Sequence, residues 1–145
     1  MFSQTAEYGL RAVVWLASHA DVPQRTGEIA KVAHVPPGYL PKVMQMLGRA
    51  KIVKSQSGPR GGFRLARPAR EIAVLDVINA IEPIERITEC PLGLAKHKGR
   101  LCPLHLRLDA ARAMIEDAFR SCSIADLVED APGSNSLCVE LGIKP

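Results

Sequence analysis

Aromatic residues and long apolar runs are both scarce in this sequence of 145 residues. Phenylalanine, tryptophan and tyrosine make up 4% of the chain, and no stretch approaches the roughly 20 consecutive apolar residues that a membrane-spanning helix needs. The apolar fraction of 47% is ordinary for a globular protein. A chain of this length has room for one compact domain and one further element. We therefore expect a protein with one core and an appendage, and no membrane partner.

A secretory signal peptide is also not evident. Residues 12–17 are apolar and the small residues 18–20 follow them, but the apolar stretch is short. Glu7 precedes it, where a signal peptide carries basic residues. We expect a cytoplasmic protein, with secretion a remote alternative. In a reducing compartment the four cysteines are not expected to form disulfides, so their spacing is first tested for metal ligation.

The sequence lacks the motifs of common small enzymes. It contains no Cys-x-x-Cys pair, phosphate-binding loop or nucleophile elbow, and no paired carboxylates in a setting suited to catalysis. No small-molecule substrate is indicated. These absences argue against an enzyme, including a thiol oxidoreductase.

Acidic residues are missing between positions 49 and 70, although the formal net charge of the whole chain is only +4. The cations of this stretch are Arg49, Lys51, Lys54, Arg60, Arg64, Arg67 and Arg70. A solvated surface would normally mix in aspartate and glutamate. A block of one sign suits a polyanion such as a nucleic-acid backbone.

Apolar periodicity predicts a mainly α protein with one small β-hairpin. Helices are expected over residues 5–20, 27–33, 39–50 and 74–84, and strands over 51–55 and 63–66. Thr26 is predicted to cap the second helix, and Pro37 to fit the first turn of the third. The order of these elements indicates a winged helix-turn-helix: short helices come first, then one helix with long polar side chains, and then a basic hairpin.

The exposed face of the helix over 39–50 is predicted to enter the major groove of DNA. Tyr39 and Gln45 are expected to reach bases, and Lys42 and Arg49 to meet phosphates. At the hairpin tip Arg60 is expected in the minor groove. The glycines beside it make a tight turn, and Gly61 also allows the backbone to approach the DNA closely. The predicted DNA-binding set is completed by Arg25, Thr26, Lys54 and Ser55.

Towards the C-terminus the apolar positions 101, 104, 108, 111, 115, 118 and 122 alternate in steps of three and four. This heptad seam is typical of a coiled coil and predicts a homodimer. The alternative is a helix that packs on its own domain. We expect four parts: a winged helix-turn-helix domain over 1–84, a cysteine-bearing sensor loop over 85–102, a dimerisation helix over 103–130 and a flexible tail over 131–145.

Five segments together resemble a known group of bacterial regulators. They are residues 5–12, 39–47, 57–66, 76–82 and 123–128, and the glycine-rich turn followed by Phe-Arg-Leu-Ala is the most specific of them. The group is typified by the iron-sulfur cluster regulator and the nitric-oxide-sensing repressor. The resemblance implies a dimer joined by its long C-terminal helix, which binds pseudo-palindromic operators and senses redox state, nitric oxide or iron-sulfur status.

The same resemblance implies a metal site before the dimer helix. In the group, three evenly spaced cysteines lie there, and an acidic residue from the first helix of the other subunit can complete the site. Cys90 and Cys102 match the outer cysteines, His105 follows at the spacing seen in cluster regulators, and Glu7 matches the acidic position. The middle cysteine is replaced by Lys96, whose charged ammonium cannot ligate.

Three states of this site stay open from the sequence. A 2Fe-2S cluster could be held by Cys90, Cys102, His105 and Glu7 of the partner subunit. The same four residues also fit zinc. In the third state the two cysteines are ordinary or redox-reactive thiols. Cys122 is interpreted as a core residue of the seam and Cys138 as incidental. A protein-interaction module that never touches DNA is a remote alternative, and the basic hairpin argues against it.

Overall fold

The computed structural model describes residues 2–129, and most of its helices pack around the first, α1 (Gln4–Ser18). Ser3 starts this helix, because its hydroxyl accepts a hydrogen bond of 3.1 Å from the backbone amide of Ala6. The helix over 5–20 is therefore confirmed, with ends one or two residues earlier than predicted. Side chains buried around it form the core, among them Leu16, Ile29, Leu40, Met44, Leu47, Ile78 and Ile124.

Helices α2 (Thr26–Val32) and α3 (Leu40–Arg49) are both present but begin differently from the prediction. The prediction that Thr26 caps α2 is wrong, because Arg25 holds that position and its carbonyl accepts the amides of Glu28 and Ile29. The prediction that Pro37 lies in the first turn of α3 is also wrong. A turn that ends with Tyr39 precedes α3, so the proline in the first turn is Pro41.

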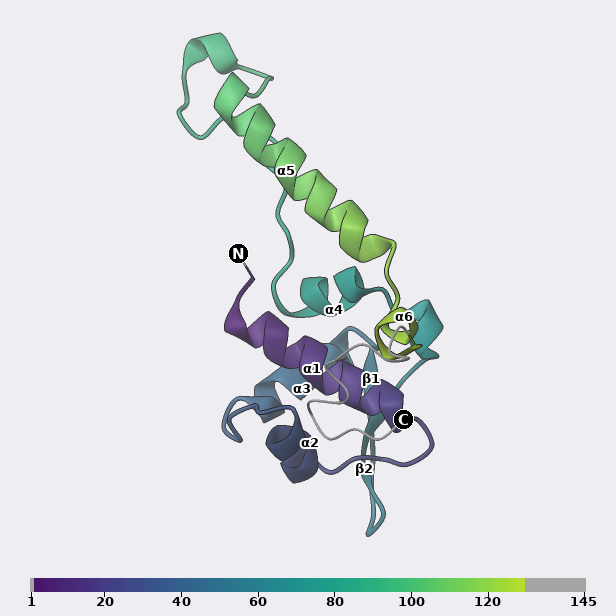
Figure 1. The fold of residues 1–145 in the computed structure, drawn as a ribbon. Helices are drawn as coiled ribbons and strands as arrows, with labels where there is room; N and C mark the ends of the chain where they lie inside the picture. The colour runs from purple at the N-terminus through teal and green to yellow at the C-terminus, as the bar shows by residue number, and fades with distance from the viewer. Residues whose placement is uncertain (1, 130–145) are drawn as a thin grey trace.

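The hairpin consists of β1 (Val53–Gln56) and β2 (Gly62–Leu65), paired antiparallel with Val53 opposite Leu65. β1 starts two residues later than predicted, because Lys51 has a φ of 56° and the amide of Ile52 bonds to the carbonyl of Leu47. These residues turn the chain out of α3 instead of extending the strand. The hairpin projects from the body as a narrow wing (Figure 1).

Gly62 fits tightly against the backbone that joins α1 to α2. Two backbone hydrogen bonds of 2.8 Å tie Phe63 to Gln24, and a Cβ at Gly62 would lie 2.5 Å from the carbonyl oxygen of Gln24. We expect Gly62→Ala to lower the free energy of unfolding by about 2 kcal/mol or more, measured by urea denaturation. Gly27→Ala is the matched control, because its Cβ would meet nothing within 4 Å. Equal stability of the two variants would contradict this packing.

After the wing the chain passes through η1 (Ala69–Glu71) into α4 (Val74–Ile81), which ends before Pro83 and so earlier than predicted. The predicted dimerisation segment 103–130 holds two helices, α5 (Pro103–Arg120) and α6 (Ile124–Glu129). Ser123 separates them, because it exchanges hydrogen bonds with Asp126 at the start of α6. Helix α6 returns to the body, where the amide of Ile124 bonds to the carbonyl of Ile72 at 2.8 Å. The predicted tail and Cys138 lie outside the described residues.

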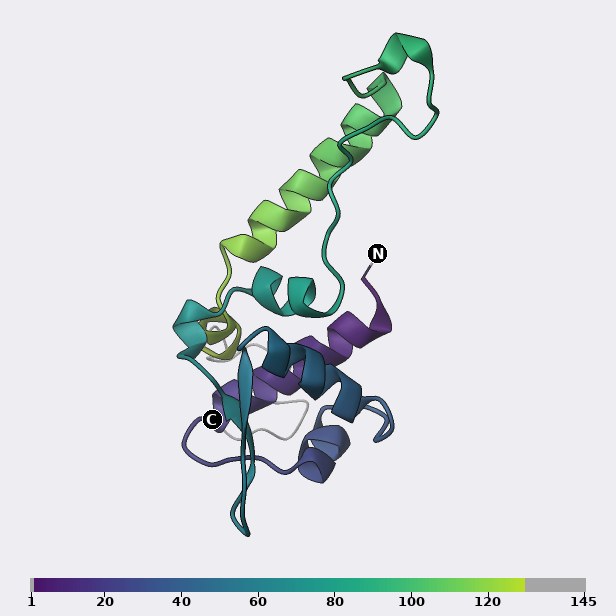
Figure 2. The same cartoon turned by 180° about the vertical axis from the view of Figure 1, so that it is seen from behind.

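Helix α5 leaves the body on the side away from the wing (Figure 2). None of its residues is buried. After α4 the chain runs alongside α5 to the far end of that helix, where it forms η2 (Ala95–His97). This stretch lies within the segment predicted as a loop. Arg86 fixes this connection, because its guanidinium contacts Asp109 at 2.5 Å and Glu116 at 3.5 Å. The Arg86 guanidinium lowers the pKa of Asp109 to about 2, so this contact stays charged at neutral pH.

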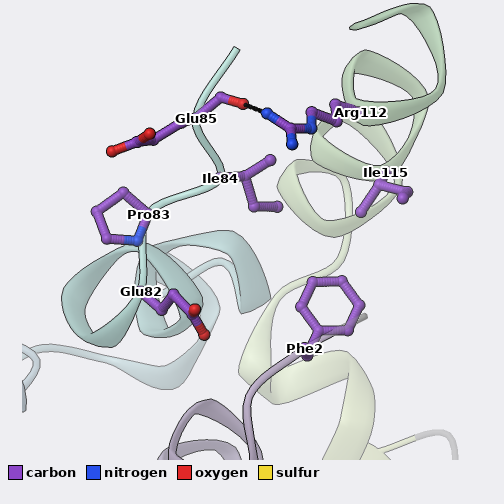
Figure 3. A pocket seen from close by; sticks show the side chains of 7 residues that line it. All are labelled: Phe2, Glu82, Pro83, Ile84, Glu85, Arg112 and Ile115. Atoms are coloured by element: carbon purple, nitrogen blue, oxygen red, sulfur yellow. Dashed lines mark hydrogen bonds between the residues drawn. The ribbon is translucent and has the colours of Figure 1, made fainter. Parts of the chain in front are cut away.

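A pocket of about 550 Å³ lies where the chain's start, the end of α4 and α5 meet (Figure 3). Phe2, Ile84 and Ile115 supply its apolar wall, and the carbonyl of Glu85 accepts a hydrogen bond from Arg112. Ile115 also belongs to the predicted seam. No helix among residues 2–129 is long and apolar enough to cross a membrane.

Candidate metal centre and nucleic-acid interface

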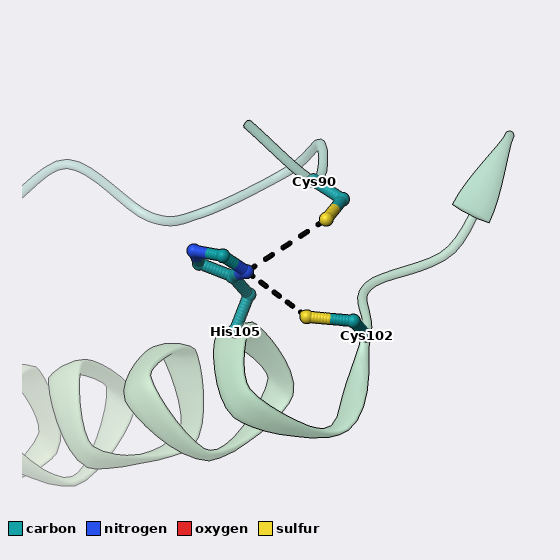
Figure 4. Close-up of side chains that lie close together, drawn as sticks. All are labelled: Cys90, Cys102 and His105. Carbon is teal, nitrogen blue, oxygen red and sulfur yellow. Dashed lines mark hydrogen bonds between the residues drawn. The ribbon is translucent and has the colours of Figure 1, made fainter. Parts of the chain in front are cut away.

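Two thiols and an imidazole meet at the far end of α5 (Figure 4). The Nδ1 atom of His105 lies 3.0 Å from Sγ of Cys102 and 3.7 Å from Sγ of Cys90. The three possible ligand atoms all lie within 4.8 Å of one another. The structure thus brings together three of the four residues that the sequence predicted for a metal site.

Local structure explains how Cys102 and His105 come to face each other. Cys102 is the N-cap of α5, with an extended backbone, and Pro103 is the first helical residue. His105, three residues after the cap, then lies in the first turn, where a side chain points back towards the cap. Cys90 reaches the pair from the other side, because the Arg86 contacts hold its segment along α5.

The Cys102 thiol is activated by this placement. Hydrogen bonds from the backbone and then the ring of His105 lower the pKa of Cys102 to about 7. A thiolate is the form that ligates metals. The lowered pKa favours the form of Cys102 that binds a metal or reacts with an oxidant.

Glu7, the predicted fourth ligand, does not join this group within one chain. It lies on α1 in the body, where its carboxylate pairs with Arg11. The resemblance implies that Glu7 acts in the site of the partner subunit, and this stays a prediction. Lys96 lies exposed in η2 at the expected place of the middle cysteine.

His97 is a further candidate ligand that was not predicted from the sequence. Its Nδ1 atom lies 3.3 Å from Sγ of Cys90. The available signal was its place beside Lys96, one residue from the position where the resembling group has a cysteine. The direction of the His97 side chain could not be predicted from this position, because an irregular loop has no periodicity that tells where a side chain points.

At the other end of the molecule, α3 presents a polar, cationic face. Its apolar side is buried, whereas Tyr39, Lys42, Gln45 and Arg49 are all exposed. The helix predicted over residues 39–50 ends at Arg49, and Ala50 beyond it is exposed. The exposed residues have the reach and the donors that a major-groove helix needs.

The wing lies beside this helix and carries the remaining predicted contacts. Arg60 is exposed at its tip, and Lys54 and Ser55 are exposed along β1. Arg25 instead donates a hydrogen bond of 2.9 Å to the carbonyl of Pro59, which ties the start of α2 to the tip. Two members of the predicted set are only half-buried rather than exposed, namely Thr26 and Gly61.

Gly61 is required by the turn itself. A Cβ at this position would lie 2.2 Å from the carbonyl oxygen of Gln56. The tight-turn interpretation of the glycines therefore has a direct steric basis. Arg60 next to Gly61 is exposed.

Comparison with known proteins decides the family of the chain. The Rrf2 family, described as an iron-dependent transcriptional regulator, matches residues 2–130. The chain belongs to the Rrf2 family. A relative from Aquifex aeolicus (strain VF5), named as an HTH-type transcriptional regulator, is 33% identical over 131 residues, which cover 88% of this chain and 91% of the relative. Rrf2 relatives are thus named as regulators rather than enzymes.

Solved structures of Rrf2 regulators have the same fold. T. potens IscR superposes with a TM-score of 0.74 at 27% identity, covering 93% of this chain and 90% of that one. CymR, the global cysteine regulator of B. subtilis, superposes with a TM-score of 0.75, covering 91% of this chain and 98% of that one. At 24% identity the second likeness concerns the fold alone. The predicted winged-helix fold with a long C-terminal helix is confirmed.

Proposed function

We propose that this chain is a homodimeric, cytoplasmic transcriptional regulator that binds operator DNA through α3 and the wing, and whose affinity follows the state of the Cys90, Cys102 and His105 centre. One observation carries the proposal. A cationic reading face and a cluster of two thiols with an imidazole lie at opposite ends of one chain, joined by α5. Such a layout suits a sensor whose signal and output are separate.

DNA binding is supported by the surface and by the family. Lys42 and Arg49 on α3 and Arg60 on the wing are exposed together on a stretch of chain free of acidic residues. Phosphate contacts from such cations supply most of the affinity for any duplex, and contacts with base edges add the specificity. Gln45 is the exposed residue of α3 best suited to a bidentate base contact.

Self-association is supported by the exposed apolar side chains of α5. Leu104 is 62% exposed and Leu108 is 47% exposed in the single chain. A helix that used its seam to pack on its own domain would bury them, so the distal half of the seam is free for a second copy. A coiled-coil contact between two α5 helices would cover both residues.

The metal centre has two candidate occupants from the resemblance and the donor chemistry. A 2Fe-2S cluster needs thiolates, which Cys90 and Cys102 supply, and histidine can replace the other thiolates. Zinc takes the same donors. The fourth ligand is either Glu7 of the partner subunit, as the resemblance implies, or a residue of the same chain.

Salt dependence of DNA binding tests the DNA interface. We expect Lys42→Ala and Arg60→Ala each to weaken binding to random duplexes and to reduce the slope of log affinity against log salt by about 0.9, the value for one phosphate contact. Gln45→Ala should instead cost about 1–3 kcal/mol at one base pair of a selected operator. Arg107→Ala is the control, since this exposed cation belongs to α5, the helix that leaves the body on the side away from the wing. If Lys42→Ala and Arg60→Ala both bind like the control, the winged-helix interface is wrong.

A further inference from the structure

We propose that the centre binds one tetrahedral divalent ion of the zinc class, held within a single chain by Cys90, Cys102, His105 and His97. This inference rests on the proposed sensory role of the Cys-His group and deepens it. In this assignment a single ion occupies the site in place of a two-iron cluster, and His97 takes the place of Glu7 from the partner subunit.

The separations of the donor atoms favour one ion over a cluster. Bond lengths of about 2.3 Å to sulfur and about 2.0–2.1 Å to nitrogen put neighbouring ligands of a tetrahedral ion about 3.6 Å apart. Three of the four sulfur-to-nitrogen pairs among these donors are separated by 3.0 Å (Cys102 and His105), 3.3 Å (Cys90 and His97) and 3.7 Å (Cys90 and His105). Two bridged irons would hold their ligand pairs at opposite ends of the cluster, farther apart than ligands of one ion. The donor atoms of Cys90, Cys102 and His105 all lie within 4.8 Å of one another, which is the shorter span expected for the ligands of one ion.

His97 is the residue best placed to complete the four ligands. It already contacts Sγ of Cys90 through Nδ1, although it lies outside the group of three within 4.8 Å. It is half-buried and belongs to η2, a single short turn in a loop, and the proposal requires its ring to move closer to the other ligands when the ion binds. Lys96 beside it is exposed and charged, and Glu7 is paired with Arg11 on α1.

The chemistry of the four donors agrees with this assignment. Two thiolates and two imidazoles form the Cys₂His₂ set of structural zinc sites. These residues close a loop of chain between Cys90 and His105, so that binding would order the segment at the head of α5. Because all four ligands come from one chain, loading would not require the dimer.

Cobalt titration of the full-length protein tests the ligand set. Metal-free protein, prepared under anoxic reducing conditions, is titrated with Co²⁺ and then with competing Zn²⁺. We expect one Co²⁺ per chain with the visible bands of a tetrahedral site. His97→Ala and His105→Ala should each weaken binding by about 100-fold or more, whereas Lys96→Ala and Glu7→Ala should stay within about threefold of the native protein.

His97→Cys separates ligation from a merely structural role. This variant should keep the ion and raise the thiolate-to-cobalt charge-transfer intensity by about half, because three thiolates replace two. Unchanged intensity with full binding would overturn the role of His97. Weak binding in Glu7→Ala with normal binding in His97→Ala would overturn the single-chain site in favour of the partner's carboxylate.

Two further results concern the ion itself. Acid-labile sulfide in amounts equal to iron in anoxically purified protein would overturn the single ion in favour of a cluster, yet leave the proposed sensor intact. No Co²⁺ binding by the native protein would overturn the metal site, and the salt dependence of DNA binding by the same sample would show whether the DNA-binding role survives.

Discussion

Leu108→Asp is expected to dissociate the proposed dimer into monomers. Leu108 lies at a seam position on α5 and is 47% exposed in the single chain, so an aspartate there does not disturb the fold of one chain. In a symmetric dimer it would bury a charge without a partner in each α5 helix. Such a burial costs about 3–5 kcal/mol, which raises the dimer dissociation constant by 100-fold or more. Sedimentation equilibrium measures this change directly.

Ala110→Asp is the matched control for that variant. Ala110 is also exposed on α5, but its position in the helix points away from the seam. It should remain dimeric and bind a palindromic operator normally, whereas Leu108→Asp should bind it poorly because a monomer covers one half-site. A dimeric Leu108→Asp protein would show that the seam does not form the dimer contact.

Cys102→Ser is expected to lose the bound metal altogether. A serine hydroxyl is a poor ligand for zinc or iron at neutral pH, whereas the Cys102 thiol has a pKa lowered to about 7. Serine is also a favoured N-cap, so the start of α5 should persist in the variant. The loss would therefore report ligation and not helix unfolding. Metal analysis of anoxically purified protein, together with the circular dichroism spectrum, checks both parts.

Cys122→Ser serves as the matched control for metal loss. Cys122 follows α5 at its other end and is not one of the residues grouped around His105. Its replacement should leave the metal content of the protein unchanged. If both serine variants keep their metal, the centre lies elsewhere in the chain.

The order of the helices and the wing followed from the sequence because those signals are local. The buried side of α3 and the glycine-rich turn depend on residues close together in the chain. The ends of the elements were harder to place. Thr26 had the composition of a cap, yet the carbonyl of Arg25 starts α2, and the break at Ser123 depends on α6 packing on the body.

The grouping of Cys90, Cys102 and His105 could be predicted only in part for a similar reason. Cys102 and His105 belong to one helix start, so their spacing alone brings them together. The arrival of Cys90 depends on long-range contacts of Arg86 with Asp109 and Glu116. His97 depends on the fold of a loop, for which no periodic pattern exists.

The central claim is that the centre controls DNA affinity, and one measurement tests it most directly. An operator is selected from random duplexes, once with metal-loaded and once with metal-free protein, and its affinity is measured in both states. We expect a difference of about fivefold or more in the native protein, and none in Cys102→Ser. Equal affinity of the loaded and metal-free native protein for every selected duplex would contradict the claim, even with one ion bound per chain.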